Sequence, residues 1–200
     1  MIRLGLDFDN TLIRYDELFH KVAREQGLIS DSVQPQKNKI RDHLRQKGIE
    51  NEWTKLQGEV YGNRILEAVA WEGMLETLLA LQEKGVELYI ISHKTRNPFL
   101  GPAYDLHAAA QSWLEKQGFF SSSGLNWQPK QVFFELTKEA KVKRVQQLGC
   151  THYVDDLPEI LEMLPASVKG IFFSPESTMP EVNQPWLVFG DWGNFQYLLE

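Results

Sequence analysis

Short apolar segments that alternate with helical patterns constrain the fold of this chain more than any other feature of its sequence. Ile2–Phe8 is an apolar run of strand length, and Val86–Ile91 is a second one that directly follows the helix-stopping Gly85. Their length, their β-branched and aromatic residues and their flanks favour strands over buried helix. The further segments of this kind are Gln131–Phe134, Thr151–Val154, Gly170–Phe173 and Trp186–Phe189.

Helical patterns lie between several of these segments. Met74–Lys84 and Tyr104–Gln117 each place apolar side chains on one face at helical spacing. Thr137 is the expected N-cap of a helix over Lys138–Leu148, and Leu157–Leu164 repeats the apolar spacing. Because strands that alternate with helices form βαβ units, the sequence predicts an α/β fold with a mostly parallel sheet and helices on both faces.

The chain between the first and second predicted strands lacks a convincing strand pattern and contains polar helical segments instead. We therefore predict that residues 1–13 and 73–200 form an α/β core domain and that residues 14–72 form an inserted helical domain. An insertion at the C-terminal end of a strand lies where ligands enter a parallel sheet, so we expect this domain to act as a lid. Its predicted helices are Glu17–Gln26, Gln36–Lys47 and Trp53–Val69.

The composition limits the kinds of partner and the cellular location that we expect for this protein. A net charge of −6 disfavours general nucleic-acid binding, because a negatively charged protein repels the phosphate backbone. Cys150 is the only cysteine, which rules out an internal disulfide framework and a cysteine-based zinc cluster. No apolar run at the N-terminus has the length of a signal peptide, and none approaches the roughly 20 residues of a membrane span. We therefore expect a cytoplasmic protein without nucleic-acid or membrane partners.

Two carboxylates follow the first predicted strand in the run Asp7-Phe8-Asp9-Asn10-Thr11. The alternation of side chains along a strand places Asp7 and Asp9 on one side and Phe8 on the other. Neighbouring carboxylates repel each other unless a cation or a shared proton compensates them, and Mg²⁺ is a hard cation that carboxylate and phosphate oxygens bind. The alternative is a plain turn at Asp9 and Asn10, with Asp7 as its hydrogen-bonded neighbour.

Asp155 and Asp156 form a second acidic pair directly after the predicted strand Thr151–Val154. Because the ends of parallel strands meet at one edge of a sheet, we expect this pair to converge with Asp7 and Asp9 on one metal ion. Capping of the following helix is the alternative, and it accounts for one of the two aspartates but not for both. Which of Asp155 and Asp156 contacts the metal directly stays open at this point.

A hydroxyl and an ammonium group are expected at the same edge of the sheet. Ser92 ends the second predicted strand, and Lys141 lies near the start of the helix before the fourth. Groups of these types hold phosphate oxygens and offset their charge. Lys138 lies one turn before Lys141 and is an alternative to it, while His93 follows Ser92 where a loop would meet substrate. Taken singly, these residues also suit a turn, a solvated helix face and a solvated loop.

Four motifs resemble, in their order along the chain, those of the haloacid dehalogenase-like (HAD) superfamily of phosphatases and phosphotransferases. They are Asp7–Thr11, Ser92, Lys141 and Asp155–Asp156. Trp71–Glu76 also resembles the stretch that precedes the second motif of that family, and the resemblance covers about residues 2–13 and 71–174. Each motif is short, whereas their conjunction is specific. The resemblance implies a three-layer sandwich with a Rossmann-like sheet, in which residues 14–72 resemble a small all-helical cap.

The resemblance also implies a role for each matching residue. Asp7 matches the nucleophile, and Asp9 matches the acid that protonates the leaving alkoxide and then activates water. Lys141 matches the residue that neutralises the phosphoryl group. The implied Mg²⁺ would be held by Asp7, the backbone carbonyl of Asp9, Asp155 and Asp156. The residues expected to bind the substrate or its phosphate are Asn10, Ser92, His93 and Lys141.

The sequence thus predicts a Mg²⁺-dependent phosphatase that hydrolyses a small phosphorylated metabolite through a phospho-aspartyl intermediate. Asp9 disfavours carbon–halogen cleavage, because a halide leaves without a proton whereas the alkoxide of a phosphate ester needs one. The alternatives are a phosphotransferase or phosphomutase and a non-catalytic binding protein with the HAD fold. A phosphatase of protein or nucleic-acid ends is less favoured by the negative charge and the insertion.

Overall fold

The computed structural model describes residues 1–175 and 185–199, except for the side chains of Gln196 and Tyr197. The chain forms two compact units, each of which is discontinuous in sequence. The first unit consists of Met1–Ile13, Ala70–Lys94 and Gly118–Glu200, and the second consists of Arg14–Val69 and Thr95–Gln117.

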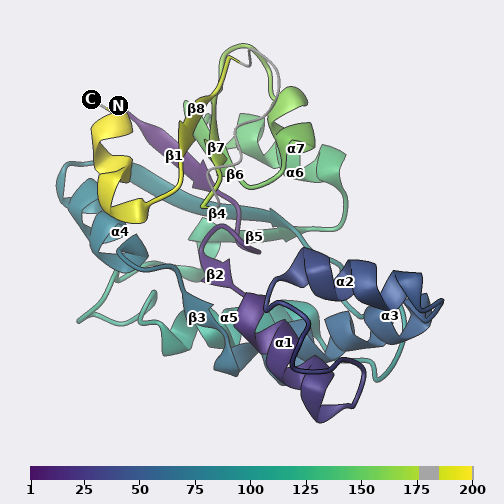
Figure 1. Cartoon of the computed structure of the whole chain (residues 1–200). Coiled ribbons are helices and arrows are strands. Elements are labelled where there is room, and N and C mark those ends of the chain that lie inside the picture. Colours follow the sequence, from purple (N-terminus) through teal and green to yellow (C-terminus); the bar gives the residue numbers. More distant parts are fainter. Residues whose placement is uncertain (176–184, 200) are drawn as a thin grey trace. The chain divides into compact units, whose positions relative to one another are not determined.

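The first unit is built on a six-stranded sheet in which every neighbouring pair of strands is parallel. The strand order is β5-β4-β1-β6-β7-β8 (Figure 1). Parallel strands that are covered on both faces need nearly continuous apolar runs, and the segments predicted as strands have them. All six predicted strands are therefore confirmed, with ends that differ by a few residues. They are β1 (Arg3–Leu6), β4 (Glu87–His93), β5 (Val132–Glu135), β6 (His152–Asp155), β7 (Lys169–Phe173) and β8 (Leu187–Phe189).

Helices cover both faces of this sheet, which confirms the predicted α/β fold. Figure 1 shows α4 and the C-terminal 3₁₀ helix η4 on one face and α6 and α7 on the other. Thr77 of α4 joins the two helices of the first face, because its hydroxyl donates to the carbonyl of Trp192 at 2.7 Å. In the described part of the chain, no helix is both long enough and apolar enough to cross a bilayer. The helices of this unit are α4 (Met74–Glu83), η3 (Pro129–Gln131), α6 (Lys138–Gln147), α7 (Pro158–Glu162) and η4 (Trp192–Leu198).

An apolar core fills the space between the sheet and the helices α6 and α7. Val145 of α6, Ile160 of α7 and Tyr153 of β6 are almost fully buried in it, and burial of such side chains contributes roughly 1.5–3 kcal/mol each. Tyr153 lies across β1, where a Cβ atom at Gly5 would come within 2.6 Å of its ring. Its hydroxyl donates to the carbonyl of Ile91 in β4 at 2.5 Å. Tyr153 therefore ties three adjacent strands together close to their carboxyl ends.

The register of the central strands decides which side chains emerge together at the sheet edge. Leu6 of β1 is paired with Ile90 of β4 and with Val154 of β6. The next residue after Leu6 is Asp7, and the next residue after Val154 is Asp155. These two aspartates therefore leave neighbouring strands at the same level.

The second unit is mainly helical and has its own aromatic core. Phe19 stacks on Trp53 with ring centroids 5.0 Å apart, and Tyr15 and Tyr61 meet Phe19 edge to face. The prediction of one helix over Trp53–Val69 is wrong, because the chain there changes from α-helix to a π-helical turn and then to a 3₁₀ helix. The helical elements are α1 (Asp16–Glu25), α2 (Lys37–Gln46), α3 (Glu50–Gly58), η1 (Glu59–Asn63), η2 (Ile65–Glu67) and α5 (Leu106–Lys116).

Two strands of two residues each lie where the chain passes from one unit to the other. They are β2 (Ile13–Arg14) and β3 (Val69–Ala70). β3 falls in the region where the sequence shows no strand pattern, since two residues are too few to produce one.

The second unit also includes Thr95–Gln117, which the sequence had placed in the core domain. Glycines on the 50–63 segment allow this close packing. A Cβ atom would lie 2.8 Å from Pro98 if added to Gly58 and 2.7 Å from Tyr104 if added to Gly62. The compact units thus differ from the predicted division at residues 70–72 and 95–117, and the role of the second unit as a lid stays a prediction.

Candidate active site

The chain turns sharply after β1. The amide of Asp7 still donates to the carbonyl of Val154 in β6 at 2.9 Å, and the amide of Ile13 donates back to the carbonyl of Phe8 at 3.3 Å. Asn10 has a φ of 62°, a left-handed conformation that asparagine adopts more readily than most residues. The residue types after the strand therefore fit the tight turn that they form.

The Asp7 carboxylate is buried and accepts hydrogen bonds from three side chains. Its Oδ1 atom lies 2.8 Å from Oγ of Ser92 and 2.6 Å from Nζ of Lys141. Its Oδ2 atom lies 3.3 Å from Oγ1 of Thr11. Ser92 comes from β4 and Lys141 from α6, so three separate parts of the chain fix the orientation of one carboxylate.

Asp155 and Asp156 lie beside Asp7 at the end of β6. Asp155 is fully buried, and its Oδ2 atom lies 2.6 Å from Nζ of Lys141. Its Oδ1 atom accepts a hydrogen bond from the amide of Leu157 at 3.0 Å. Asp155 therefore binds both Lys141 and the backbone just before α7. Asp156 accepts the side-chain amide of Asn10 at 3.2 Å. Asn10 is thereby linked to the second acidic pair.

Helix α6 delivers one of two candidate lysines to this group. Thr137 caps the helix as predicted, because its hydroxyl accepts the amide of Ala140 at 3.1 Å. Lys141 points inward and its side chain is 2% exposed, whereas Lys138 points outward and pairs with Glu159 at 2.6 Å. The structure therefore brings Lys141, and not Lys138, to the carboxylates.

The three aspartates have the geometry and the charge to hold a divalent cation. Asp7, Asp155 and Asp156 each offer one carboxylate oxygen, and these atoms lie within 4.8 Å of one another. Burial raises the pKa of Asp155 to about 7 against the opposing effect of Lys141. Burial also opposes the charge on Lys141, but Asp7 and Asp155 outweigh it and hold the pKa of Lys141 well above its ordinary value. Lys141 offsets one negative charge of the three aspartates. The negative charge that is left and the hard oxygen donors suit Mg²⁺.

Asp9 has a partner that the sequence did not indicate. Nζ of Lys94 lies 2.9 and 2.7 Å from the two carboxylate oxygens of Asp9. The Lys94 side chain is only 3% exposed, although it follows a strand directly and begins a loop. Side-chain alternation is the signal that finds it, because Ser92 and Lys94 are two residues apart and so point to the same side.

His93 points elsewhere. Its Nε2 atom lies 3.2 Å from the carbonyl oxygen of Leu136, which follows β5. Alternation along β4 gives the reason, since His93 lies between Ser92 and Lys94 and faces the opposite side. The structure therefore groups Ser92 and Lys141 with Asp7, Asp155 and Asp156 and sets His93 against the neighbouring loop. The Asp9 carboxylate, which the sequence predicted to converge with these aspartates, is not part of their group of close oxygen atoms and binds Lys94 instead.

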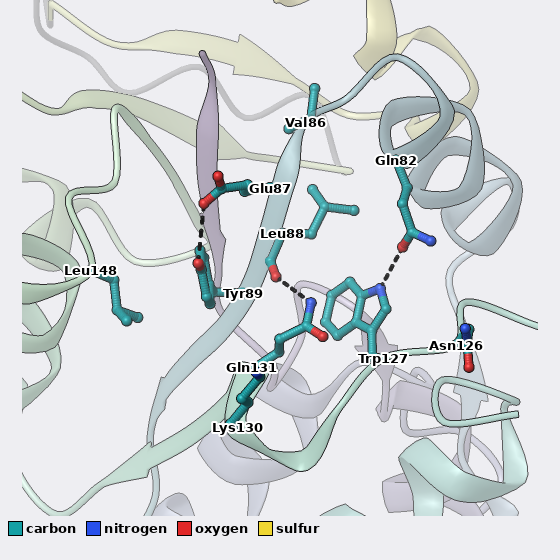
Figure 2. A pocket seen from close by; sticks show the side chains of 10 residues that line it. All are labelled: Gln82, Val86, Glu87, Leu88, Tyr89, Asn126, Trp127, Lys130, Gln131 and Leu148. Carbon is teal, nitrogen blue, oxygen red and sulfur yellow. Dashed lines mark hydrogen bonds between the residues drawn. The ribbon is translucent and has the colours of Figure 1, made fainter.

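A cavity of about 440 Å³ lies at the other end of β4 and does not include these residues (Figure 2). It is lined by side chains around Leu88 and Trp127, close to the start of the strand. Its polar groups bind one another: the indole of Trp127 donates to Gln82 at 2.9 Å, and Gln131 donates to the carbonyl of Leu88 at 3.1 Å. The carboxylates lie instead at the carboxyl ends of the strands, where ligands bind in parallel sheets.

No protein-family model matches the chain. Over 171 residues the chain is 26% identical to a protein named "Putative nucleotidase OB0422" from Oceanobacillus iheyensis. The alignment covers 82% of this chain and 81% of that protein, so the similarity is not confined to a few motifs.

Solved structures match over the whole chain. A HAD-superfamily hydrolase from Geobacter sulfurreducens has a TM-score of 0.59 and 13% identity, with 100% of this chain and 97% of that chain covered. A protein named "putative HAD-hydrolase YfnB" from Bacillus subtilis, bound to magnesium, has a TM-score of 0.57 and 14% identity, with coverage of 100% and 98%. The chain has the haloacid dehalogenase-like fold.

L-2-haloacid dehalogenase from Xanthobacter autotrophicus, with chloropropionic acid covalently bound, shares the HAD fold with this chain at a TM-score of 0.56 and 12% identity. That alignment covers 100% of this chain and 98% of the dehalogenase. The resemblance indicated by the sequence motifs is thus confirmed at the level of the fold. A shared fold does not determine the reaction, which depends on the residues of the site.

Proposed function

We propose that this protein is a Mg²⁺-dependent phosphatase that hydrolyses small phosphate monoesters through a phospho-aspartyl intermediate. The observation that carries the proposal is the Asp7 carboxylate, which binds Ser92 and Lys141 and shares a group of close oxygen atoms with Asp155 and Asp156. A nucleophile, donors for phosphate oxygens and hard metal ligands are what phosphoryl transfer requires.

The first step transfers the phosphoryl group to the protein. A carboxylate oxygen of Asp7 attacks phosphorus, and the bond from phosphorus to the leaving oxygen breaks. Asp9 gives a proton to that oxygen, while Ser92 and Lys141 stabilise the charge on the transferred group. Bound by Asp7, Asp155 and Asp156, Mg²⁺ would reduce the repulsion between the phosphate and the carboxylates.

The second step restores the free enzyme. Asp9, now a carboxylate, takes a proton from a water molecule that attacks phosphorus, and the bond from phosphorus to Asp7 breaks. Inorganic phosphate leaves, and Asp9 is again protonated for the next cycle. One carboxyl group thus acts as acid and then as base, which requires that it stay beside the nucleophile throughout.

Asp9 favours phosphate esters over haloacids as substrates. A halide departs as a stable anion, whereas an alkoxide is a poor leaving group unless it is protonated. The nucleotidase relative suggests nucleoside monophosphates as the first substrates to test, followed by other phosphorylated metabolites. We propose a small phosphorylated metabolite as the partner of this site.

The test is phosphate release from nucleoside monophosphates and from a panel of metabolite phosphates, with Mg²⁺ and with a chelator. We expect activity that requires the metal and that falls by about 10⁴-fold or more in Asp7→Asn, because the nucleophile is lost. Asp42→Asn is the matched control, since Asp42 is an exposed aspartate paired with Arg41. An Asp7→Asn variant as active as the wild type would refute the phospho-aspartyl mechanism.

Two further measurements separate the rival activities. A phosphotransferase would move the phosphoryl group to an added sugar phosphate faster than to water. A dehalogenase would release chloride from chloropropionate. Either result, without metal-dependent phosphate release from any ester, would overturn the proposal.

A further inference from the structure

Lys94 is a buried lysine whose ammonium group is directed at the carboxylate of Asp9. Both Asp9 oxygens lie within hydrogen-bonding distance of Nζ, at 2.9 and 2.7 Å. The same nitrogen lies 5.4 Å from the centroid of the Phe8 ring, so it is flanked by an aromatic face. Asp9 is less enclosed than the lysine, since its side chain is 22% exposed against 3% for Lys94. Lys94 is therefore the more buried partner of this ion pair, and the Asp9 carboxylate is the more exposed one.

The ion pair of Lys94 and Asp9 is not explained by a contribution to folding stability alone. Removal of two charged groups from water carries a desolvation penalty that often exceeds their attraction, and apolar side chains of similar size stabilise a core as well or better. A buried lysine beside an acid–base residue therefore calls for a functional explanation.

The backbone of Lys94 is held by a hydrogen bond to the neighbouring strand. Its amide donates to the carbonyl of Glu135 at 2.8 Å and so extends the ladder between β4 and β5 by one residue. Ser92 and Lys94 point to the same side of this extended strand. Ser92 binds Asp7 and Lys94 binds Asp9, so β4 supplies one donor to each carboxylate of the β1 loop.

We propose that Lys94 is a positioning residue that holds the carboxyl group of Asp9 in the orientation needed for proton transfer to the leaving group. This inference rests on the proposed phosphoryl transfer. Asp9 follows β1 and forms an isolated β-bridge with Ile13, which fixes its backbone but not the rotation of its side chain. The two-oxygen contact with Lys94 restricts that rotation. Proton transfer depends steeply on such placement.

The proposal is tested with two substrates that differ in the basicity of the leaving group. Phenyl phosphate needs a proton on its leaving oxygen, whereas dinitrophenyl phosphate does not. The quantity to compare is kcat/KM, because it reports only the steps up to departure of the phenol. We expect Lys94→Met to lower kcat/KM for phenyl phosphate by about 10- to 100-fold, as a misplaced acid would, and to change that for dinitrophenyl phosphate far less.

Three further variants complete the experiment. Lys94→Arg should recover part of the activity on phenyl phosphate, because a guanidinium group can also hold two carboxylate oxygens. Asp9→Asn should show the same selective loss as Lys94→Met. Adding Lys94→Met to Asp9→Asn should cause no further selective loss, because the two residues act as one unit. If Lys94→Met does not fold, Lys94→Gln provides the same comparison.

Equal losses on both substrates would overturn the positioning role and indicate that Lys94 binds the phosphate itself. Independent, multiplying losses in the double variant would overturn it as well. Neither outcome affects the proposed function, which is tested separately by metal-dependent phosphate release from the wild type and by the Asp7→Asn variant.

Discussion

Lys141 and Lys138 lie one turn apart on α6 but have opposite surroundings. Lys141 is buried between Asp7 and Asp155, and Lys138 forms an exposed pair with Glu159. Removal of one partner from a buried set of charged side chains leaves the charges of the others uncompensated. An exposed ion pair, in contrast, contributes little to the free energy of unfolding. The two lysines therefore form a matched pair for mutation.

We expect Lys141→Met to lower phosphate release by about 10²-fold or more, because a donor at the developing charge is removed. It should also lower the free energy of unfolding by about 3–5 kcal/mol in the absence of metal, since Asp7 and Asp155 lose their counter-charge. Lys138→Met should keep full activity and change stability by less than about 1 kcal/mol. Phosphate assays and urea unfolding measure both effects, and equal effects of the two variants would contradict the assignment.

At the level of single residues, the sequence indicated those side chains whose position follows from strand ends. Asp7, Ser92 and Asp155 each come at the end of an apolar run, and parallel strands bring such ends together. Lys94 was not among the residues predicted for the site, because a lysine that follows a strand is more often solvated. Alternation with Ser92 indicates the side to which Lys94 points, but its burial and its contact with Asp9 appear only in the folded structure.

Among the elements, α6 matters most for the site because it carries Lys141 in its first turns. Thr137 fixes the start of this helix through the bond from its hydroxyl to the amide of Ala140. The cap fixes the residue at which the helix starts. Because the start of the helix determines which way each later side chain faces, the cap also fixes the direction of Lys141.

We expect Thr137→Ala to lower the free energy of unfolding by about 1 kcal/mol, because one amide of the first turn loses its acceptor. Thr137→Ser keeps the hydroxyl and should stay close to the wild type. Urea unfolding of the two variants measures the difference. A Thr137→Ser variant as unstable as Thr137→Ala would show that the methyl group, rather than the hydrogen bond, stabilises this position.

Element types were easier to predict than the grouping of elements. The strands of the first unit are apolar because helices cover both faces, so each strand has a strong local signal. The membership of Thr95–Gln117 in the second unit has no such signal. It depends on contacts of Pro98 with Gly58 and of Tyr104 with Gly62, between residues about 40 positions apart. The single helix predicted over Trp53–Val69 was wrong because apolar spacing does not show where an α-helix changes to a π turn and then to a 3₁₀ helix.

At the scale of the whole molecule, the proposed site exists only when distant parts of the chain are folded together. Asp7 meets Ser92 across 85 residues and Lys141 across 134. Local structure in any one element therefore cannot assemble it, and activity should be lost with the cooperative unfolding of the first unit. Cys150 offers an independent probe of that unfolding, because it is the only cysteine and lies 5% exposed in the core beside Val145 and Tyr153.

Burial raises the pKa of the Cys150 thiol to about 11. The thiolate is the reactive form, so at mildly alkaline pH the folded protein should react with a thiol reagent at least about 10²-fold more slowly than a free thiol such as glutathione. The same shift means that the unfolded state loses this proton first, so stability falls as pH rises above the pKa of a free thiol. In urea, the labelling rate should rise along the same curve as the loss of activity, because both report opening of one core. Native labelling as fast as that of glutathione would show that the core around β6 opens without global unfolding.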